Sequence, residues 1–202
     1  MKIICIGRNY IDHAKELNNP VPSRPLVFMK PASALLKDGR DFYYPEFSKD
    51  IHFELELVLK ISKNGKYIEE RLAEKYYDEI GLGIDFTARD LQNKCKEKGH
   101  PWEIAKAFDH SAVLGKFISK SELEEGNIDF KLLKNGEIVQ NGNSIDLIFP
   151  FATLIAHVSK FFTLNKGDLL FTGTPAGVGP VQVGDQLEGL IGESSLLQCE
   201  VK

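Results

Sequence analysis

The stretch HFELELVL at residues 52–59 decides the fold class. Apolar residues alternate with other types along it, and a period of two is typical of a β-strand with two different faces. Because residues two apart share a face, the pattern predicts that Phe53 and the leucines pack inward while His52, Glu54 and Glu56 line the other side. One strand therefore carries part of the core and two neighbouring carboxylates.

Other strand signals surround this stretch. Residues 2–6 and 80–85 are apolar runs of strand length, and residues 168–201 alternate short apolar runs with Gly-rich turns. Asn64-Gly65 and Asn135-Gly136 have the residue types of two-residue hairpin turns, and the strand signals that flank Asn135-Gly136 make it the stronger hairpin.

Helical signals are fewer and shorter. Residues 10–17 predict a short helix that ends at the breakers Asn18-Asn19-Pro20. Residues 70–78 are weakly helical, and Pro150 opens a helix that we expect to reach Phe162. Many short strands with few helices predict a β-rich α+β fold, a sandwich or roll with minor helices.

Length and composition limit the function classes. A chain of 202 residues with 43% apolar residues suits one domain, which we expect to span residues 1–202. The net charge of -4 gives no basic face for nucleic acid or anionic lipid, and no stretch approaches the ~18 apolar residues of a membrane span. Cys5, Cys95 and Cys199 form neither a disulfide framework nor a C-x-x-C pair, so a reducing cytoplasm is the expected compartment.

Three carboxylates suggest a metal site. A strand rise of about 3.3 Å per residue sets the Cα atoms of Glu54 and Glu56 about 6.5–7 Å apart, so both side chains can reach one ion. Asp85 adds a third carboxylate at a strand end, where sites tend to be built, and such oxygen ligands select Mg²⁺, Mn²⁺ or Ca²⁺. The alternatives are a solvated strand face for the glutamates and a helix N-cap for Asp85, while Asp90 is expected to face outward beside Lys94.

His13 and Glu16 are three residues apart in the predicted first helix, so they face the same way. A carboxylate beside an imidazole fixes its tautomer and raises its basicity, which suits a general base. The short helix, bracketed by Gly7 and Pro20, is expected to act as a lid. The alternative is an ordinary pair on the surface of an amphipathic helix.

The Gly-rich loop at residues 172–180 follows an apolar strand. It lacks the P-loop pattern and is not followed by a helix as a dinucleotide fingerprint would be. Its backbone N–H groups and threonine hydroxyls can hold a carboxylate, and the alternative is a plain loop. Lys106 has apolar neighbours that would lower its pKa if it were buried, although a solvated lysine is the default expectation there.

Five blocks, in this order, resemble the fumarylacetoacetate hydrolase family in its short single-domain form, closest to the branch of acylpyruvases and oxaloacetate decarboxylases. They are Gly7-Arg8-Asn9-Tyr10 with His13 and Glu16, Pro25 to Pro31, Glu54-Leu55-Glu56-Leu57, Asp85 to Gln92 with Pro101-Trp102 and Lys106 after it, and Gly167-Asp168 with Thr172 to Gly179.

The resemblance implies a mixed β-sandwich roll with an N-terminal lid helix, usually dimeric, with one Mg²⁺ or Mn²⁺. It implies roles for nine side chains: the metal on Glu54, Glu56 and Asp85; catalysis by His13, Glu16 and Lys106; and substrate contacts from Arg89, Gln92 and Thr174.

The implied activity is metal-dependent cleavage of a small 2-oxo acid, by acylpyruvate hydrolysis, oxaloacetate decarboxylation or both, through a metal-stabilised enolate. In this scheme His13 activates water for hydrolysis, Lys106 offsets charge and Gln92 orients the substrate. One alternative within the enzyme class is an isomerase, tautomerase or decarboxylase of dienoates from aromatic catabolism. An alternative from another class is a metal-dependent dicarboxylate-binding protein without turnover.

Overall fold

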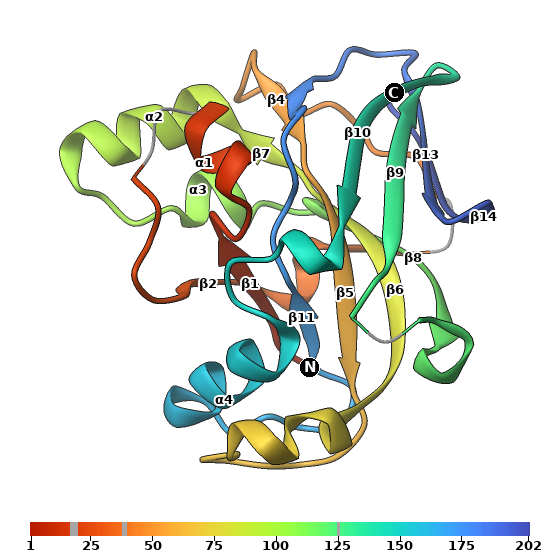
Figure 1. Ribbon diagram of the computed structural model, residues 1–202. Coiled ribbons are helices and arrows are strands. Elements are labelled where there is room, and N and C mark those ends of the chain that lie inside the picture. The colour runs from red at the N-terminus through yellow and green to blue at the C-terminus, as the bar shows by residue number, and fades with distance from the viewer. Residues whose placement is uncertain (17–19, 38–39, 125) are drawn as a thin grey trace.

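A mixed seven-stranded sheet forms one layer of the computed structural model, which describes residues 1–16, 20–37, 40–124 and 126–202 (Figure 1). Its strands are β1 (Ile3–Gly7), β2 (Leu26–Lys30), β3 (Leu35–Lys37), β5 (Leu55–Ile61), β6 (Tyr77–Asp85), β8 (Ala112–Ser119) and β11 (Leu169–Phe171). They lie in the order β2-β1-β11-β5-β6-β8-β3, so the strand with the alternating pattern is central. The pairs β1–β11 and β3–β8 are parallel, and the other neighbours are antiparallel.

A four-stranded antiparallel sheet packs across the large one. It contains, in spatial order, β10 (Glu137–Asn143), β9 (Asp129–Lys134), β13 (Gln186–Ile191) and β14 (Ser194–Glu200). Leu55 and Leu82 of the large sheet share one buried cluster with Leu132, Leu187 and Leu197 of the small one. The two inner faces therefore form the sandwich core that the period-two pattern of β5 predicts.

Both central strands break at the same level. β4 (Ile51–Phe53) precedes β5 with Glu54 between them, and β7 (Thr87–Ala88) follows β6 with Phe86 between them. β4 and β7 pair with each other and, together with β12 (Gly179–Pro180), form a separate three-stranded sheet. The β5–β6 ladder thus turns into the β4–β7 ladder, and Glu54 and Asp85 lie at the bend.

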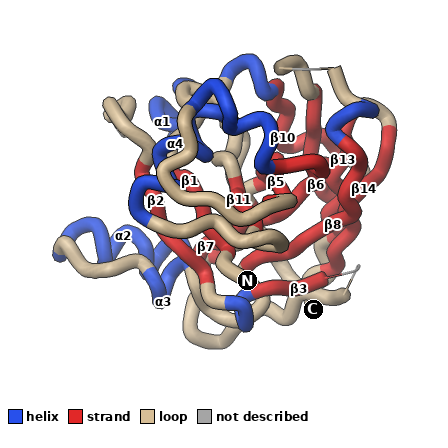
Figure 2. Tube along the Cα trace, turned by 90° about the horizontal axis from the view of Figure 1, so that it is seen from below, coloured by secondary structure: helices blue, strands red, loops and turns tan. Residues whose placement is uncertain are grey.

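The α-helices lie at two ends of the sheets in Figure 1, and the view from below in Figure 2 shows α2 and α3 projecting to one side of the strands. Helices α1, α2 and α3 gather near β7, whereas α4 packs on the 3₁₀-helix η2 at the far end. The helical segments are α1 (Ile11–Glu16), α2 (Arg89–Lys98), α3 (Glu103–Lys106), α4 (Phe151–Phe161), η1 (Ala32–Ala34), η2 (Glu70–Tyr76), η3 (Lys120–Glu122) and η4 (Ser144–Asp146). Within the described ranges, no helix is long and apolar enough to cross a membrane.

The predicted fold class is confirmed: strands predominate and the helices are short. The strands at 2–6 and 80–85 and the helix after Pro150 form as expected. In the hairpin between β9 and β10, Asn135 and Gly136 both have positive φ, as a two-residue turn of this type requires. The expected end of the first helix, at residues 17–19, lies outside the described residues.

The hairpin predicted at Asn64-Gly65 is wrong. β5 and β6 are antiparallel neighbours, but the chain between them runs through η2, and Gly65 forms an isolated bridge with Leu164. A Cβ atom at Gly65 would lie 2.3 Å from the Tyr76 ring. This glycine therefore permits a close approach to Tyr76 rather than a tight turn.

Candidate active site

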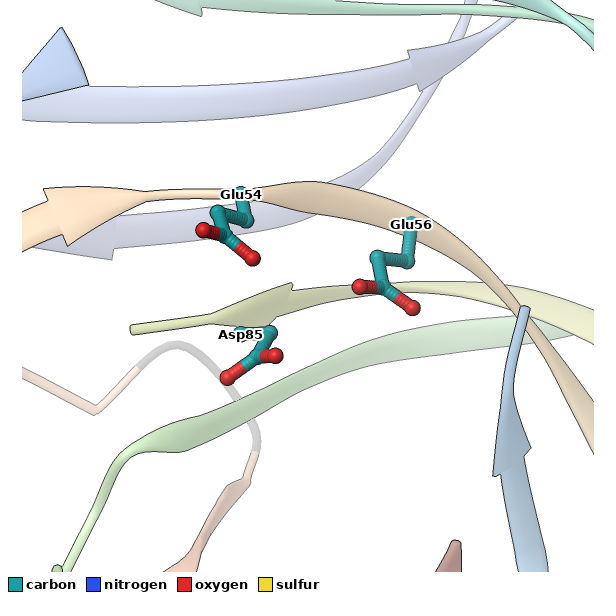
Figure 3. A group of neighbouring side chains, drawn as sticks. All are labelled: Glu54, Glu56 and Asp85. Carbon is teal, nitrogen blue, oxygen red and sulfur yellow. The ribbon is translucent and has the colours of Figure 1, made fainter. Parts of the chain in front are cut away.

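The three predicted metal ligands converge from two strands. Glu54 and Glu56 come from the β4–β5 strand and Asp85 from the end of β6, and their carboxylates lie side by side (Figure 3). One ligand atom from each lies within 4.8 Å of the other two, and all three residues are buried. The Asp85 N–H donates to the Glu54 carbonyl at 2.8 Å, which joins the two strands at the bend. All-oxygen, all-carboxylate ligands at this spacing fit a hard divalent cation.

Buried cations surround only part of this cluster. The Lys106 ammonium lies 2.7 Å from both Glu54 and Asp85, and the Arg89 guanidinium lies 2.5 Å from Glu54. Lys30, fully buried, lies 2.7 Å from the other oxygen of Asp85. Charge-assisted contacts of this kind are the strong ones in a protein interior, so Glu54 and Asp85 are both compensated.

Glu56 has no such cationic partner among the residues that the structure describes. Within the described part of the chain, its carboxylate has one hydrogen bond, accepted from the Gly173 N–H at 2.7 Å. Gly173 has φ +105, and a Cβ there would lie 2.6 Å from Asn9, so the loop can turn its N–H onto Glu56 only with glycine.

The two glutamates consequently titrate in opposite directions. Burial raises the pKa of Glu54, but Lys106 and Arg89 outweigh it and hold that pKa well below its usual range. Burial, reinforced by Asp85, raises the pKa of Glu56 well above its usual range. The position beside Glu56 therefore needs either a proton or an added cation, and the donor set fits a metal ion there.

Lys106 differs from the solvated lysine that is the default expectation. Its side chain is buried, and its ammonium also donates to the Thr87 hydroxyl at 2.6 Å. Burial lowers the pKa of Lys106, but the carboxylates of Asp85 and Glu54 reverse the effect and raise it. Lys106 therefore stays charged at neutral pH and shares two carboxylates with any ion that the cluster binds.

The His13–Glu16 pair lies on α1 at the edge of the same cavity. His13 is buried, its Nδ1 lies 3.4 Å from Glu16, and the Glu16 side chain is about one-third exposed. Glu16 also accepts from the Gly177 N–H at 3.1 Å, which joins α1 to the Gly-rich loop. Burial lowers the pKa of His13 despite the opposing effect of Glu54 and Glu16, so the imidazole is neutral at pH 7. A surface pair is thereby excluded.

The remaining predicted residues line the same narrow cavity of about 30 Å³. Gln92 accepts from Arg89 at 2.7 Å, and Thr174 lies in the Gly-rich loop. Asp90 is not a simple outward partner of Lys94, because it accepts from Ser48 at 2.6 Å.

Sequence reasoning missed several cations of the site. Lys30, which contacts Asp85, ends an apolar strand, and a charge at such a place is the signal that would have revealed it. Arg8 and Lys96, which line the cavity, were missed as well. His52 was expected on the carboxylate face, but the strand break at Glu54 turns it toward Asp50, 2.9 Å away.

The family model for the fumarylacetoacetate (FAA) hydrolase C-terminal region matches residues 2–202. The chain belongs to the fumarylacetoacetate hydrolase family. The resemblance drawn from the sequence blocks is therefore confirmed.

Individual relatives of this family agree with the assignment. The chain is 42% identical to oxaloacetate tautomerase YcgM of Escherichia coli over 188 residues, which cover 92% of this chain and 86% of that protein. It is 39% identical over 187 residues to the human mitochondrial oxaloacetate tautomerase FAHD1, covering 92% of this chain and 85% of that protein.

A solved structure also agrees with the family assignment. The fumarylpyruvate hydrolase of Pseudomonas aeruginosa, crystallised with Mn²⁺ and pyruvate, superposes with a TM-score of 0.93 at 38% identity, covering 100% of this chain and 89% of that one. As a fumarylacetoacetate hydrolase family member with such relatives, the protein is an enzyme that acts on small oxo acids.

Proposed function

We propose that the protein is a Mg²⁺- or Mn²⁺-dependent enzyme that forms an enolate from a 2-oxo dicarboxylic acid, with oxaloacetate as the first candidate substrate. The observation that carries the proposal is the pair of buried glutamates with opposite environments, one compensated and one open to a cation. Glu54, Glu56 and Asp85 would hold the ion, which would act as a Lewis acid on the 2-oxo acid.

The side chains around the cluster supply the remaining chemistry. Neutral His13, oriented by Glu16, is suited to remove or return the C3 proton of the substrate. Charged Lys106 offsets the negative charge that develops on the keto oxygen. Gln92, Arg89 and Thr174 would position the 2-oxo carboxylate.

The charge of the cavity favours a dianionic substrate. Arg8 and Lys96 are half-buried cavity residues, and neither has an ion pair within the described ranges. Burial, together with repulsion from Arg89 and Arg8, lowers the pKa of Lys96 to about 8. Two uncompensated cations at the cavity favour a second substrate carboxylate, as in oxaloacetate, over a neutral acyl group.

The relatives leave three reactions open for such an enolate. Tautomerisation needs only proton transfer, decarboxylation also breaks the C3–C4 bond, and acylpyruvate hydrolysis needs a nucleophilic water. The names of the tautomerase relatives favour proton transfer as the main activity. Hydrolysis is the second candidate, supported by the fumarylpyruvate hydrolase neighbour.

A substrate panel tests the proposal. Purified protein is incubated with oxaloacetate and acetylpyruvate in Mn²⁺, in Mg²⁺ and in EDTA. Enol–keto exchange is followed by ultraviolet absorbance, and pyruvate release by a coupled assay. Metal-dependent turnover of oxaloacetate with a low rate on acetylpyruvate is expected. Equal rates in EDTA would overturn the metal assignment, and binding without turnover of either compound would leave a dicarboxylate-binding protein. A dienoate substrate added to the panel tests the aromatic-catabolism alternative.

We further propose that residues 1–202 act as one catalytic domain and that the protein is a homodimer in a reducing compartment such as the cytoplasm. The three cysteines are free and buried, which supports the compartment. Light scattering tests the dimer: a 22.7 kDa particle at micromolar concentration would contradict it.

A further inference from the structure

No functional signal in the sequence marks Gln140, yet it is 1% exposed and its side chain contacts the site from the second sheet. Its Oε1 accepts from the Leu55 N–H at 2.9 Å. Its Nε2 donates to the Thr174 hydroxyl at 2.9 Å and to the Pro175 carbonyl at 3.0 Å. One side chain of β10 therefore joins the strand segment between the two glutamates to the Gly-rich loop.

The hydrogen bond between Gln140 and Leu55 takes the place of a backbone hydrogen bond that β11 would make if it continued along β5. β11 pairs with β5 up to Phe171 opposite Val58, and the Thr172 N–H still donates to the Leu57 carbonyl at 3.1 Å. Continuing this register would set Thr174 opposite Leu55, but the chain leaves the sheet at Gly173. The Gln140 amide oxygen accepts the Leu55 N–H instead, so no backbone donor is left unpaired there.

The partners also fix the orientation of the Gln140 amide. A backbone N–H can only donate, so Leu55 requires the amide oxygen, and a carbonyl can only accept, so Pro175 requires the amide nitrogen. Thr174 Oγ1 must therefore accept from Gln140. Its own proton is left to point elsewhere, and within the described residues no protein acceptor takes it.

Thr174 lines the catalytic cavity, so the proton of its hydroxyl group can point into that cavity. We propose that Gln140 is a positioning residue: by donating to Thr174 Oγ1 it commits the Thr174 hydroxyl to donate to the carboxylate of the bound 2-oxo acid. The proposal rests on the proposed function for its ligand, but the hydrogen-bond pattern that carries it does not.

The loop has little freedom to find another arrangement. A Cβ atom on Gly177 would lie 2.2 Å from the Val139 carbonyl, and one on Gly142 would lie 2.9 Å from Pro175. The bulge of β10 next to Gln140 is thus pressed against the loop, and the same loop holds Glu16 through Gly177. Gln140 can therefore influence the Thr174 hydroxyl directly. Through the loop, which holds Glu16, it can also influence the position of α1.

Gln140→Glu is the decisive variant. It keeps the oxygen that accepts from Leu55, and its other oxygen carries at most one proton, which the Pro175 carbonyl takes. That oxygen can then only accept from the Thr174 hydroxyl, which turns away from the cavity to donate to it. We expect pyruvate, titrated calorimetrically in the presence of Mn²⁺, to bind about 10- to 100-fold more weakly, the range for a lost hydrogen bond to a charged group. KM for oxaloacetate should rise in parallel, with a smaller change in kcat. The variant should add no further loss of affinity in a Thr174→Val background.

Matched variants separate positioning from simple destabilisation. Ser159 of α4 is buried far from the site and also accepts a backbone N–H, that of Ile68, so Ser159→Ala should lower Tm without changing pyruvate affinity. Thr174→Ser should retain affinity, whereas Thr174→Val should lose it. Gln140→Met should speed amide exchange at Leu55 and in residues 172–177, whereas Gln140→Glu should affect only the loop.

Normal pyruvate affinity in folded Gln140→Glu would overturn the proposal, as would additive losses in the double variant. If Gln140→Glu does not fold, the two Thr174 variants decide, because wild-type affinity in Thr174→Val would show that the hydroxyl makes no contact with the ligand. A wild-type protein that neither binds pyruvate nor turns over any 2-oxo acid overturns the proposed function instead. Amide exchange in Gln140→Met then decides whether Gln140 holds the loop.

Discussion

Glu54 and Glu56 share one strand face two residues apart, yet their surroundings are nearly opposite. Glu54 lies between Lys106 and Arg89, whereas Glu56 accepts, from the described residues, only the Gly173 N–H. The first carboxylate is part of a buried ion-pair network, and the second is a buried carboxyl group that needs either a proton or an added cation. Identical residues on one face can therefore have different consequences for stability while serving the same metal.

Neutralising each glutamate in turn is expected to give the largest difference, measured as the free energy of unfolding. Glu54→Gln leaves Arg89 and Lys106 with less compensation in the interior, and breaking a buried pair typically costs about 3–5 kcal/mol. Glu56→Gln replaces a carboxyl group whose ionised form is opposed by burial and by Asp85, so the metal-free protein should be as stable as wild type or more stable. Urea unfolding in EDTA measures both.

Both variants should lose about 10³-fold or more of turnover, because metal-assisted charge stabilisation is worth several kcal/mol. Equal destabilisation by the two substitutions would contradict the contrast. Asp85→Asn, which disturbs Lys30 and Lys106, is expected to resemble Glu54→Gln rather than Glu56→Gln.

Adding a metal ion tests whether the ion binds beside Glu56. An ion held by the cluster stabilises the folded protein by about 2.7 kcal/mol at a hundredfold excess over its Kd. Mn²⁺ should therefore raise the Tm of wild-type protein reversibly with EDTA. The rise should be lost in Glu56→Gln, and an undiminished rise in that variant would place the ion elsewhere.

A substitution of Lys106 tests whether the cation beside Glu54 and Asp85 limits the affinity of the cluster for a metal ion. Lys106→Met removes a cation that shares Glu54 and Asp85 with the ion, so calorimetry should give tighter Mn²⁺ binding than in wild type. Turnover should fall, because the charge opposite the keto oxygen is lost. Weaker Mn²⁺ binding would mean that Lys106 organises the carboxylates rather than competing for them.

The pH profile gives a further effect, centred on His13. Its pKa is lowered by burial, so the neutral base persists below pH 6.5, and kcat/KM should fall only as the pH drops through this lowered value. The same shift means that charging His13 costs stability as the pH falls below 6.5. His13→Gln should remove this limb of the kcat/KM profile.

If His13 activates water, His13→Gln should lower acetylpyruvate hydrolysis by about 10²–10⁴-fold and leave more of the oxaloacetate decarboxylation. Equal losses for both substrates would assign His13 to closure of α1 or to substrate orientation.

The sequence predicted those parts of the fold that depend on local pattern. The alternation in residues 52–59 predicted the central strand, and positive φ at Asn135-Gly136 followed from residue type. Asn64-Gly65 has the same dipeptide but forms no hairpin, and Gly65 instead forms a bridge with Leu164 of a distant segment. Local turn chemistry does not reveal such a contact.

The candidate site likewise has features that local sequence pattern predicted and features that it did not. The convergence of Glu54 and Glu56 followed from strand periodicity, but the unequal charge around them comes from Lys106 and Arg89, which lie on two other elements. Gln140 reaches the site from the second sheet, and no spacing in the sequence connects it with Leu55 or Thr174.

The pairing of β1 with β11 has a consequence for biosynthesis. Ile3 lies opposite Leu169, so the first strand made must wait for one of the last. At about 5–20 residues per second, the ribosome takes roughly ten to thirty seconds to supply that partner. β2 can cover one edge of β1 early, since Ile3 pairs with Lys30, but the other edge of this apolar strand stays open to wrong partners. A nascent chain stalled before residue 169 would therefore be the form most in need of a chaperone.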